Sequence, residues 1–202
     1  MDGTVAGLAG VVLSGGGGAR LGGRDKSVLE YDGRRLLDRV LDALGDCEAV
    51  VVAGPPVPTG RPVTFVREDP PSGGPVAGLL AAVRALAPGP ARGPELVVVV
   101  AVDMPLLTAW TVTRLRAAAA GRDGAVLVDG EGRRHLAACL RLARLEARVG
   151  GGTGHGVAWR ALLEPLDLAE VPAVEDEGRD VDTWADLPGG AAPPEAPGGG
   201  VA

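Results

Sequence analysis

Residues 10–27 read GVVLSGGGGARLGGRDKS, and this is the most informative stretch of the chain. The apolar run 11–13 ends in a loop that holds six glycines and the cations Arg20, Arg24 and Lys26. A buried strand that runs into glycines presents backbone N–H groups to a phosphate, because glycine allows positive φ and a close approach of the backbone. The pattern therefore predicts a phosphate-binding loop after a strand, with Arg20 and Lys26 supplying the counter-charge. A flexible turn is the alternative, since 33 of the 202 residues are glycine.

The spacing of these glycines excludes two common phosphate loops. The dinucleotide fingerprint needs glycines at i, i+2 and i+5, but Gly15 and Gly17 are followed by Arg20. The Walker loop needs a glycine directly before a Lys-Ser pair, but Asp25 precedes Lys26. What remains is a run of glycines followed by an arginine, further glycines and a lysine.

Apolar runs rich in β-branched residues recur along the chain and alternate with helical patterns. The runs cover 11–13, 49–53, 63–66, 96–102, 125–128 and 136–140, and helical spacing falls at 36–44, 76–86 and 112–119. Strands that are apolar throughout, alternating with helices, are typical of a parallel sheet that is covered on both faces. We therefore predict an α/β fold with three layers, in which helices cover both faces of a mostly parallel sheet. Thr108 is the expected N-cap of the third helix, and Pro75 suits the first turn of the second.

Composition places the chain among small globular proteins. Its 202 residues suggest one domain with a sizeable core. Only 2% of the residues are aromatic and the net charge is −6, which argues against nucleic-acid binding. Residues 188–202 read PGGAAPPEAPGGGVA, which is too poor in apolar side chains to order. We therefore predict a folded domain over 1–187 and a disordered tail over 188–202.

Cysteine and histidine usage suggests no metal centre. Cys47 and Cys139 lie far apart without metal-ligand spacing, and we expect buried thiols in a reducing cytosol. His135, on an apolar run, is expected to be a satisfied core residue, and no role is assigned to it or to His155. Residues 1–9 lack the features of a signal peptide, and no apolar run approaches the roughly 20 residues of a membrane span. These features predict a cytoplasmic protein without membrane contact.

Asp103 directly follows the strongest apolar run, in the order Val102-Asp103-Met104-Pro105. A carboxylate at the end of a central parallel strand lies at the carboxyl edge of the sheet, where open α/β folds bind ligands. Mg²⁺ takes one or two carboxylates together with substrate phosphates, so this position suits a metal ligand. A turn-forming aspartate, or a cap for the next helix, is the alternative.

Two further carboxylates, Asp180 and Asp182, lie two positions apart in the segment RDVDTWADL. In an extended chain they share one face, and that face could complete a Mg²⁺ site with Asp103. The alternative is that Asp182 or Thr183 caps a short helix and Asp186 closes a capping box. Both interpretations can hold, because a capping aspartate keeps a free oxygen.

A proline- and glycine-rich turn, REDPPSGGPVAGL, occupies residues 67–79 and leads into the second predicted helix. Gly73, Gly74 and Gly78 leave room for a flat group to lie against the backbone. Asp69 could accept hydrogen bonds from a base or a ribose. An ordinary loop-to-helix junction is the alternative interpretation of the same residues.

Four segments occur in the order and rough spacing of the molybdenum cofactor guanylyltransferase family, within the nucleoside triphosphate transferase superfamily. They are LSGGGGARLGGRDK, REDPPSGGPVAGL, VAVDMPLL and RDVDTWADL, so the chain resembles this family over residues 10–187. The first segment is shared across the superfamily. The GP(V/L)AGL block favours the guanylyl branch, because cytidylyl relatives tend to carry a serine-rich segment there. The resemblance implies a Rossmann-like nucleotidyltransferase fold.

The resemblance also implies roles for individual residues. The positions that match functional residues of the family are Leu13, Ser14, Gly15, Lys26, Asp69 and Asp103, and Gly16 and Gly78 in the same segments are further predicted nucleotide-binding residues. Arg20 and Lys26 would be the catalytic cations that act on the phosphates. Asp103 would hold Mg²⁺, and the spacing of the acidic segment adds Asp182 as a second ligand.

The implied reaction transfers GMP from GTP to the phosphate of molybdenum–molybdopterin, with Mg²⁺ as cofactor, and releases pyrophosphate. The second pKa of a phosphate monoester is about 6, so the acceptor is largely a dianion at pH 7 and needs no general base. GTP and molybdopterin would be the partners, together with transient contacts to cofactor-assembly or recipient enzymes. A cytidylyltransferase, or another nucleotidyltransferase with a small acceptor, is the alternative within the class. A non-catalytic nucleotide-binding module is the alternative outside it.

The chain departs from the family pattern at three places. An asparagine often follows the second strand of the family and helps to hold the nucleotide, whereas Ala53 or Gly54 stands here. Trp184 replaces the usual proline. The basic segment that often precedes the last strand reads GGGTGHGVAWR, which leaves Arg160 as its main cation.

Overall fold

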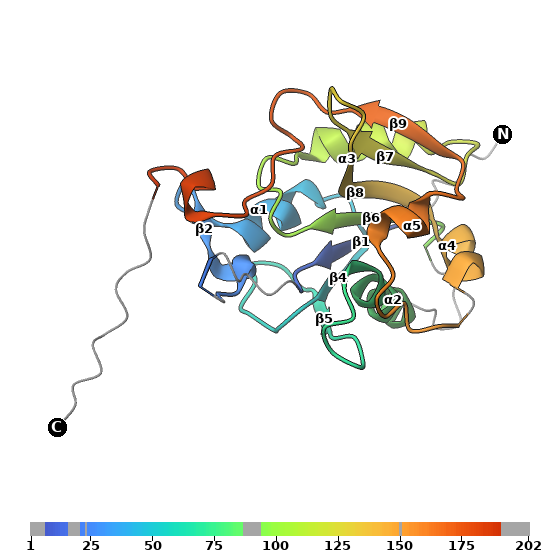
Figure 1. Ribbon diagram of the computed structural model, residues 1–202, viewed down its shortest axis with the longest axis horizontal. Helices are drawn as coiled ribbons and strands as arrows, with labels where there is room; N and C mark the ends of the chain where they lie inside the picture. The colour runs from blue at the N-terminus through green and yellow to red at the C-terminus, as the bar shows by residue number, and fades with distance from the viewer. Residues whose placement is uncertain (1–6, 16–20, 23, 87–93, 150, 191–202) are drawn as a thin grey trace.

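The computed structural model describes residues 7–15, 21–22, 24–86, 94–149 and 151–190. Its core is a seven-stranded sheet in the order β5-β4-β1-β6-β8-β7-β9 (Figure 1). The strands are β1 (Leu8–Leu13), β4 (Ala49–Ala53), β5 (Thr64–Val66), β6 (Leu96–Ala101), β7 (Gly124–Val128), β8 (Arg134–Arg141) and β9 (Leu168–Pro172). The helices are α1 (Leu36–Ala43), α2 (Pro75–Leu86), α3 (Ala109–Ala118), α4 (Leu142–Val149) and α5 (Trp159–Leu163). A separate hairpin joins β2 (Glu30–Tyr31) to β3 (Arg34–Arg35).

The central strands are apolar on both faces, as expected for a sheet between two helical layers. Every residue of β1 and β6 is buried, and these strands pair in parallel from Leu8↔Leu96 to Leu13↔Ala101. The pairs in the sheet are parallel except those of β8, which runs antiparallel to β6 and β7. The predicted α/β fold with a mostly parallel sheet is confirmed.

Two apolar clusters fill the space between the sheet and its helices. On one face, α1 and α3 contribute side chains such as Leu36 and Leu115. On the other face, α2 and α4 contribute side chains such as Leu79 and Leu145, and α5 adds Leu163. The predicted three layers are therefore present, with helices on both faces.

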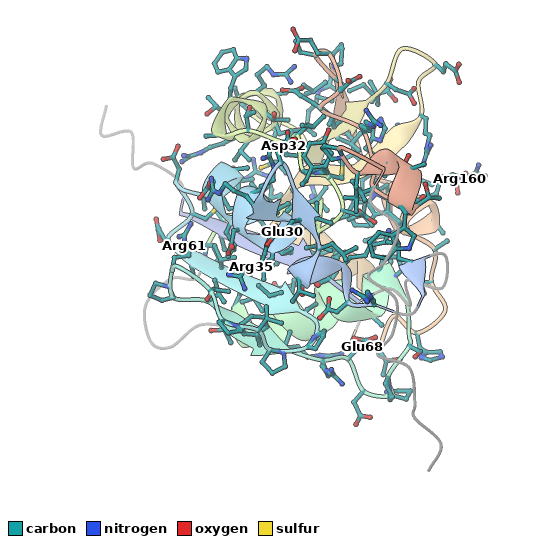
Figure 2. All side chains as sticks on the ribbon, turned by 90° about the vertical axis from the view of Figure 1, so that its left-hand side faces the viewer. Glu30, Asp32, Arg35, Arg61, Glu68 and Arg160 are labelled. Atoms are coloured by element: carbon teal, nitrogen blue, oxygen red, sulfur yellow. The ribbon has the colours of Figure 1, made fainter. Side chains whose placement is uncertain are left out.

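The strand register brings functional positions to one edge of the sheet. β1, β4 and β6 pair in parallel, and β8 runs antiparallel to both β6 and β7, so β7 points the same way as β6. Because β9 pairs in parallel with β7, the carboxyl ends of β1, β4, β6, β7 and β9 share this edge. Because Val100 of β6 pairs with Ala137 of β8, the antiparallel strand begins at the same edge. In Figure 1 the arrowheads of β1, β6 and β9 point to the left, which is the side that faces the viewer in Figure 2.

Residues 173–187, which we call the C-terminal strap, run from β9 back across the carboxyl edge (Figure 1). Glu177 holds the strap on α3 by pairing with Arg114. Further along, the Val181 N–H donates to the Asp103 carbonyl at 2.8 Å, and the Val181 side chain is fully buried. The strap therefore ends beside the carboxyl end of β6.

The last described residues, 188–190, form a turn in which the Gly190 N–H donates to the Leu187 carbonyl at 3.0 Å. The rest of the predicted tail, 191–202, lies outside the described residues. No helix in the described segments is long and apolar enough to cross a membrane.

Candidate active site

The loop after β1 begins at the carboxyl edge, between β4 and β6. Leu13 ends the strand and is buried, and the Ser14 N–H donates to the Ala53 carbonyl at 2.9 Å. Gly15 is exposed, and a Cβ there would lie 3.8 Å from the Ala53 oxygen. This open backbone suits the close approach of a phosphate. The predicted loop residues Gly16 and Arg20 lie outside the described residues.

Lys26 follows this loop in the chain, at the start of the short 3₁₀ helix η2 (Lys26–Val28). Asp25 caps that helix by accepting a hydrogen bond from the Ser27 N–H at 2.9 Å. The Lys26 ammonium lies between two carboxylates, 2.7 Å from Asp103 Oδ2 and 2.8 Å from Asp182 Oδ1. Burial by itself would lower the pKa of Lys26, but the hydrogen bonds and charges of the two carboxylates outweigh it and raise the pKa. Three residues predicted from distant parts of the sequence thus meet.

The strap forms the capping box that is one of the two interpretations of its acidic segment. Asp186 Oδ2 accepts hydrogen bonds from the N–H groups of Thr183, at 2.7 Å, and of Asp182, at 3.1 Å. Asp186 thereby closes the first turn of η3 (Trp184–Asp186), as the predicted capping box requires. Because the cap uses Asp186, the Asp182 carboxylate is free to contact Lys26.

Asp180 takes a different partner from Asp182. It is half-buried and lies 3.5 Å from Arg133. Burial, followed by the charge of Asp103, raises the pKa of Asp180. Within the described part of the chain, no three His, Cys, Asp or Glu side chains gather as a metal site would need. Asp180 and Asp182 thus contact cations from different parts of the chain, Arg133 and Lys26, and a Mg²⁺ site on their shared face stays a prediction.

The turn before α2 places its glycines in different settings. Gly74 has a φ of +86°, and among the described atoms a Cβ there would meet nothing within 4 Å. Gly78 is buried in α2, where a Cβ would lie 3.3 Å from that of Ala53. The room predicted at Gly78 is therefore taken up by the sheet, since its missing side chain lets α2 pack closely on β4. Asp69 is exposed at the same turn.

A second glycine-rich loop, residues 151–156, contacts this turn. The Gly156 N–H donates to the Gly73 carbonyl at 2.9 Å. His155 is exposed and lies against Gly73, where a Cβ would be 3.0 Å from His155 Nδ1. The loop leads directly into α5, which contacts β8 through Trp159. It therefore connects the turn before α2 with the β8 side of the sheet.

A cavity of about 650 Å³ lies beside the start of β8. It is lined by Gly132, Arg133, Arg134, Trp159, Arg160 and Glu164. Three arginines around one indole ring favour an anionic ligand with a flat group. Figure 2, which looks onto the carboxyl edge, shows Arg160 at the upper right and Glu68 of the turn before α2 at the lower right. Sequence reasoning identified Arg160 but missed Arg133 and Arg134, whose signal was an Arg-Arg pair at the start of an apolar run.

Cys47, Cys139 and His135, which were predicted to be core residues, are all buried. Cys47 and Cys139 are buried thiols, as predicted, and burial raises their pKa values to about 11 and about 12. His135 is also buried, but neither of its ring nitrogens has a hydrogen-bond partner among the described residues. Asp129 Oδ2 lies 3.8 Å from His135 Nε2, beyond hydrogen-bond range. The expectation of a satisfied core histidine is therefore wrong.

Comparison with known proteins places this geometry in a family. The family model for the MobA-like NTP transferase domain matches residues 10–171. A Mycobacterium tuberculosis protein named as a probable molybdenum cofactor guanylyltransferase is 37% identical over 171 residues, which cover 81% of this chain and 83% of that relative.

Two solved structures share the fold. Molybdopterin-guanine dinucleotide biosynthesis protein A from Archaeoglobus fulgidus has a TM-score of 0.62 and 21% identity, over 89% of this chain and 94% of its own. The 2-C-methyl-D-erythritol 4-phosphate cytidylyltransferase from Thermus thermophilus has a TM-score of 0.64 and 20% identity, over 90% of this chain and 95% of its own. Together with the domain match over most of its length, these findings show that the chain is a nucleotidyltransferase and belongs to the MobA-like NTP transferase domain family.

Proposed function

We propose that this protein transfers GMP from GTP to the phosphate of molybdenum–molybdopterin, which yields molybdopterin guanine dinucleotide and pyrophosphate. The name of the 37% identical Mycobacterium tuberculosis relative supports this reaction. The observation that carries the proposal is the convergence of Lys26, Asp103 and Asp182 beside the loop after β1. A cation and two carboxylates at the carboxyl edge of an open α/β sheet are suited to nucleotide phosphates and their metal ion.

The proposed transfer joins two phosphates. An oxygen of the acceptor phosphate forms a bond to the α-phosphorus of GTP. The bond from that phosphorus to the α–β bridging oxygen breaks, and pyrophosphate leaves with the electron pair. The acceptor has a second pKa of about 6 and is largely a dianion at pH 7, so no general base is needed. The protein therefore has to position the two reactants and to neutralise charge.

The loop after β1 and the Lys26 side chain would position the triphosphate and neutralise its charge. Backbone N–H groups of the loop, from Gly15 onward, would bind triphosphate oxygens. The Lys26 ammonium would contact the α-phosphate, where stabilisation of developing charge speeds the transfer. A lysine suits this role because its ammonium is a compact charge on a flexible stem. We propose that Arg20 contacts the same phosphates, because it lies between Gly15 and Lys26 in the sequence of the loop.

Asp103 and Asp182 fit a divalent cation. Their oxygens converge on one point, which is held by another cation, the Lys26 ammonium, at 2.7 and 2.8 Å. Carboxylate oxygens are ligands that Mg²⁺ accepts, usually one or two of them together with substrate phosphates. We therefore propose that Asp103 and Asp182 hold Mg²⁺, which when bound would neutralise charge on the triphosphate.

The arginine-lined cavity is the proposed acceptor site. Arg133, Arg134 and Arg160 would attract the phosphate, and the Trp159 ring would lie against the flat part of the acceptor. The Trp159 Nε1–H donates to the His135 carbonyl at 3.2 Å, which fixes the orientation of the ring. Because the product is a cofactor, we also propose transient contacts with enzymes that supply the acceptor or receive the product.

Guanine is proposed to lie on the turn before α2, near Asp69 and Gly74. The asparagine that many relatives carry after the second strand would not fit at Gly54 without movement, since a Cβ there would lie 2.8 Å from the Ser14 Cβ. Selection of the base therefore depends on the turn itself. A site built on hydrogen bonds discriminates strongly, because a wrong base leaves buried polar groups unpaired.

Pyrophosphate release from GTP, CTP, ATP and UTP, each with Mg²⁺ and a molybdopterin acceptor, tests this function. We expect release from GTP, and only when both the acceptor and Mg²⁺ are present. A preference for CTP would assign the protein to the cytidylyl branch. Tight nucleotide binding without release from any triphosphate would instead indicate a non-catalytic binding module.

A further inference from the structure

Lys26 is the one lysine in a sequence whose Lys and Arg residues total 20, so the other 19 are arginine. We propose that the Lys26 ammonium is a resident counter-ion, which occupies the place of a divalent cation between Asp103 and Asp182 until a nucleoside triphosphate draws it away. This inference rests on the proposed metal site. It goes beyond that site by assigning Lys26 a role before any substrate is bound.

The contacts of Lys26 put it in direct competition with a metal ion. Its Nζ atom lies 2.7 Å from Asp103 Oδ2 and 2.8 Å from Asp182 Oδ1, which are lengths of charge-assisted hydrogen bonds. The side chains of Lys26 and Asp103 are only 13% and 21% exposed, so solvent screens their contact weakly, whereas Asp182, at 53%, is the more exposed partner. A magnesium ion binds oxygen at about 2.0–2.1 Å, so a metal on Asp103 Oδ2 and Asp182 Oδ1, the two oxygens that Lys26 contacts, must displace the ammonium.

The use of lysine at this one position has a physical reason. A guanidinium is a rigid planar fork that matches one carboxylate in a two-point contact. An ammonium is a compact charge on a flexible four-carbon stem, so it can bridge two carboxylates and later swing to a phosphate. It also carries three donors, of which the two carboxylates use two.

The electrostatics explain why the ammonium is needed in the nucleotide-free protein. Without it, the partly buried Asp103 carboxylate and the more exposed Asp182 carboxylate would lie near each other with no cation between them, and their like charges would repel. Either a lysine or a divalent cation removes this repulsion, and lysine is always present in the chain. The site is therefore stable when empty of nucleotide, but its affinity for free metal is reduced.

A triphosphate changes this balance because it offers anionic oxygens to both cations. Lys26 can move to the phosphate, and the metal can take the two carboxylates together with phosphate oxygens. Metal and nucleotide then bind cooperatively. By linkage, each strengthens the binding of the other by the same factor.

Binding of Mn²⁺ to the nucleotide-free protein, followed by electron paramagnetic resonance, tests the proposal. Lys26→Gln keeps a polar side chain but removes the charge. Arg24→Gln is the matched control, since it removes an exposed positive charge two positions away, whose guanidinium lies 5.7 Å from the Trp184 ring. We expect Lys26→Gln to bind Mn²⁺ about tenfold more tightly than the wild type, a usual size for coupling between sites, and Arg24→Gln to match the wild type.

Two results separate failure of this proposal from failure of the metal site. If the wild type binds Mn²⁺ with a non-hydrolysable GTP analogue and Asp103→Asn does not, the metal site stands. Equal or weaker Mn²⁺ binding by nucleotide-free Lys26→Gln would then overturn the counter-ion role alone. If Asp103→Asn binds Mn²⁺ as well as the wild type does with the analogue, both proposals are wrong.

The single lysine also permits a test on the unaltered chain. Lysine labelled with ¹³C at Cε gives one side-chain resonance, which needs no assignment by mutation. Addition of the GTP analogue without metal should shift this resonance, because the ammonium leaves the carboxylates for a phosphate. A resonance that does not respond to the analogue would contradict the proposal, whatever the behaviour of the variants.

Discussion

The backbone N–H of Val181 donates a hydrogen bond to the carbonyl of Asp103 at 2.8 Å. This bond seats the C-terminal strap on the end of β6. The next residue in the chain, Asp182, then reaches Lys26 with its carboxylate at 2.8 Å. The proposed metal pair is thus assembled from the end of one strand and a strap that returns from the far edge of the sheet.

Asp103→Asn should lower turnover by roughly 10²–10³-fold, the scale of one lost electrostatic contact in a transition state. The fold should persist, because asparagine has nearly the same shape and the bond from Val181 goes to the Asp103 backbone. Steady-state pyrophosphate release measures the loss, and circular dichroism checks the fold. Near-normal turnover at saturating Mg²⁺ would contradict the assignment of Asp103.

Arg160→Ala should raise the KM for the acceptor while leaving the Kd for GTP unchanged, because Arg160 lines the proposed acceptor cavity. Arg122→Ala is the matched control, since Arg122 is exposed and pairs with Asp167 at 2.7 Å outside that cavity. Acceptor titrations and GTP calorimetry measure the two quantities. Weaker GTP binding with an unchanged acceptor KM would move Arg160 to the nucleotide side.

Gly124→Ala should destabilise the protein by about 1–3 kcal/mol, the usual cost of overpacking a core. A Cβ at Gly124 would lie 2.5 Å from the Cys139 carbonyl oxygen, between paired strands that cannot easily separate. Gly60→Ala is the control, because among the described atoms nothing lies within 4 Å of its Cβ position. Urea unfolding compares the two, and equal midpoints would show that β7 and β8 yield more readily than their packing indicates.

Stability should fall at alkaline pH partly because of the buried thiols. Burial raises the pKa of Cys47 from 9.0 to about 11 and that of Cys139 from 9.0 to about 12. The unfolded chain therefore releases these protons first, so the thiol contribution is complete below pH 9 and is lost as pH rises through the folded values. Urea midpoints of the Cys47→Ala/Cys139→Ala variant should decline less between pH 9 and pH 11 than those of the wild type. Parallel declines would show that other groups cause the loss.

Much of the fold could be predicted because fully buried parallel strands carry apolar residues on both faces. The runs at 49–53 and 96–102 became β4 and β6 with few changes at their ends. β9 was missed because it is an edge strand, with exposed Glu170 and Pro172 in place of a continuous apolar run. The direction of β8 follows from the short turn at 129–133, which allows only an antiparallel partner for β7. The sequence DGEG was the available signal for that hairpin.

The site could be predicted only in part, because the partner of a side chain depends on tertiary packing. Asp103 was identifiable, since it directly follows a central strand. The different partners of Asp180 and Asp182 were not identifiable, because they depend on how the strap folds between Arg133 and Lys26. Arg133 was missed because one arginine carries little information in a chain with 19 of them. The predicted room for a flat group beside Gly78 is absent, because the space beside a helical glycine depends on how closely the sheet packs against the helix.

Mass spectrometry of the products formed from GTP, Mg²⁺ and molybdenum–molybdopterin by the purified protein tests guanylyl transfer most directly. We expect molybdopterin guanine dinucleotide and an equimolar amount of pyrophosphate, and neither product when Mg²⁺ is removed by a chelator. Formation of a cytosine dinucleotide from CTP in preference to the guanine product, or of no dinucleotide from any triphosphate, would contradict guanylyl transfer at this site.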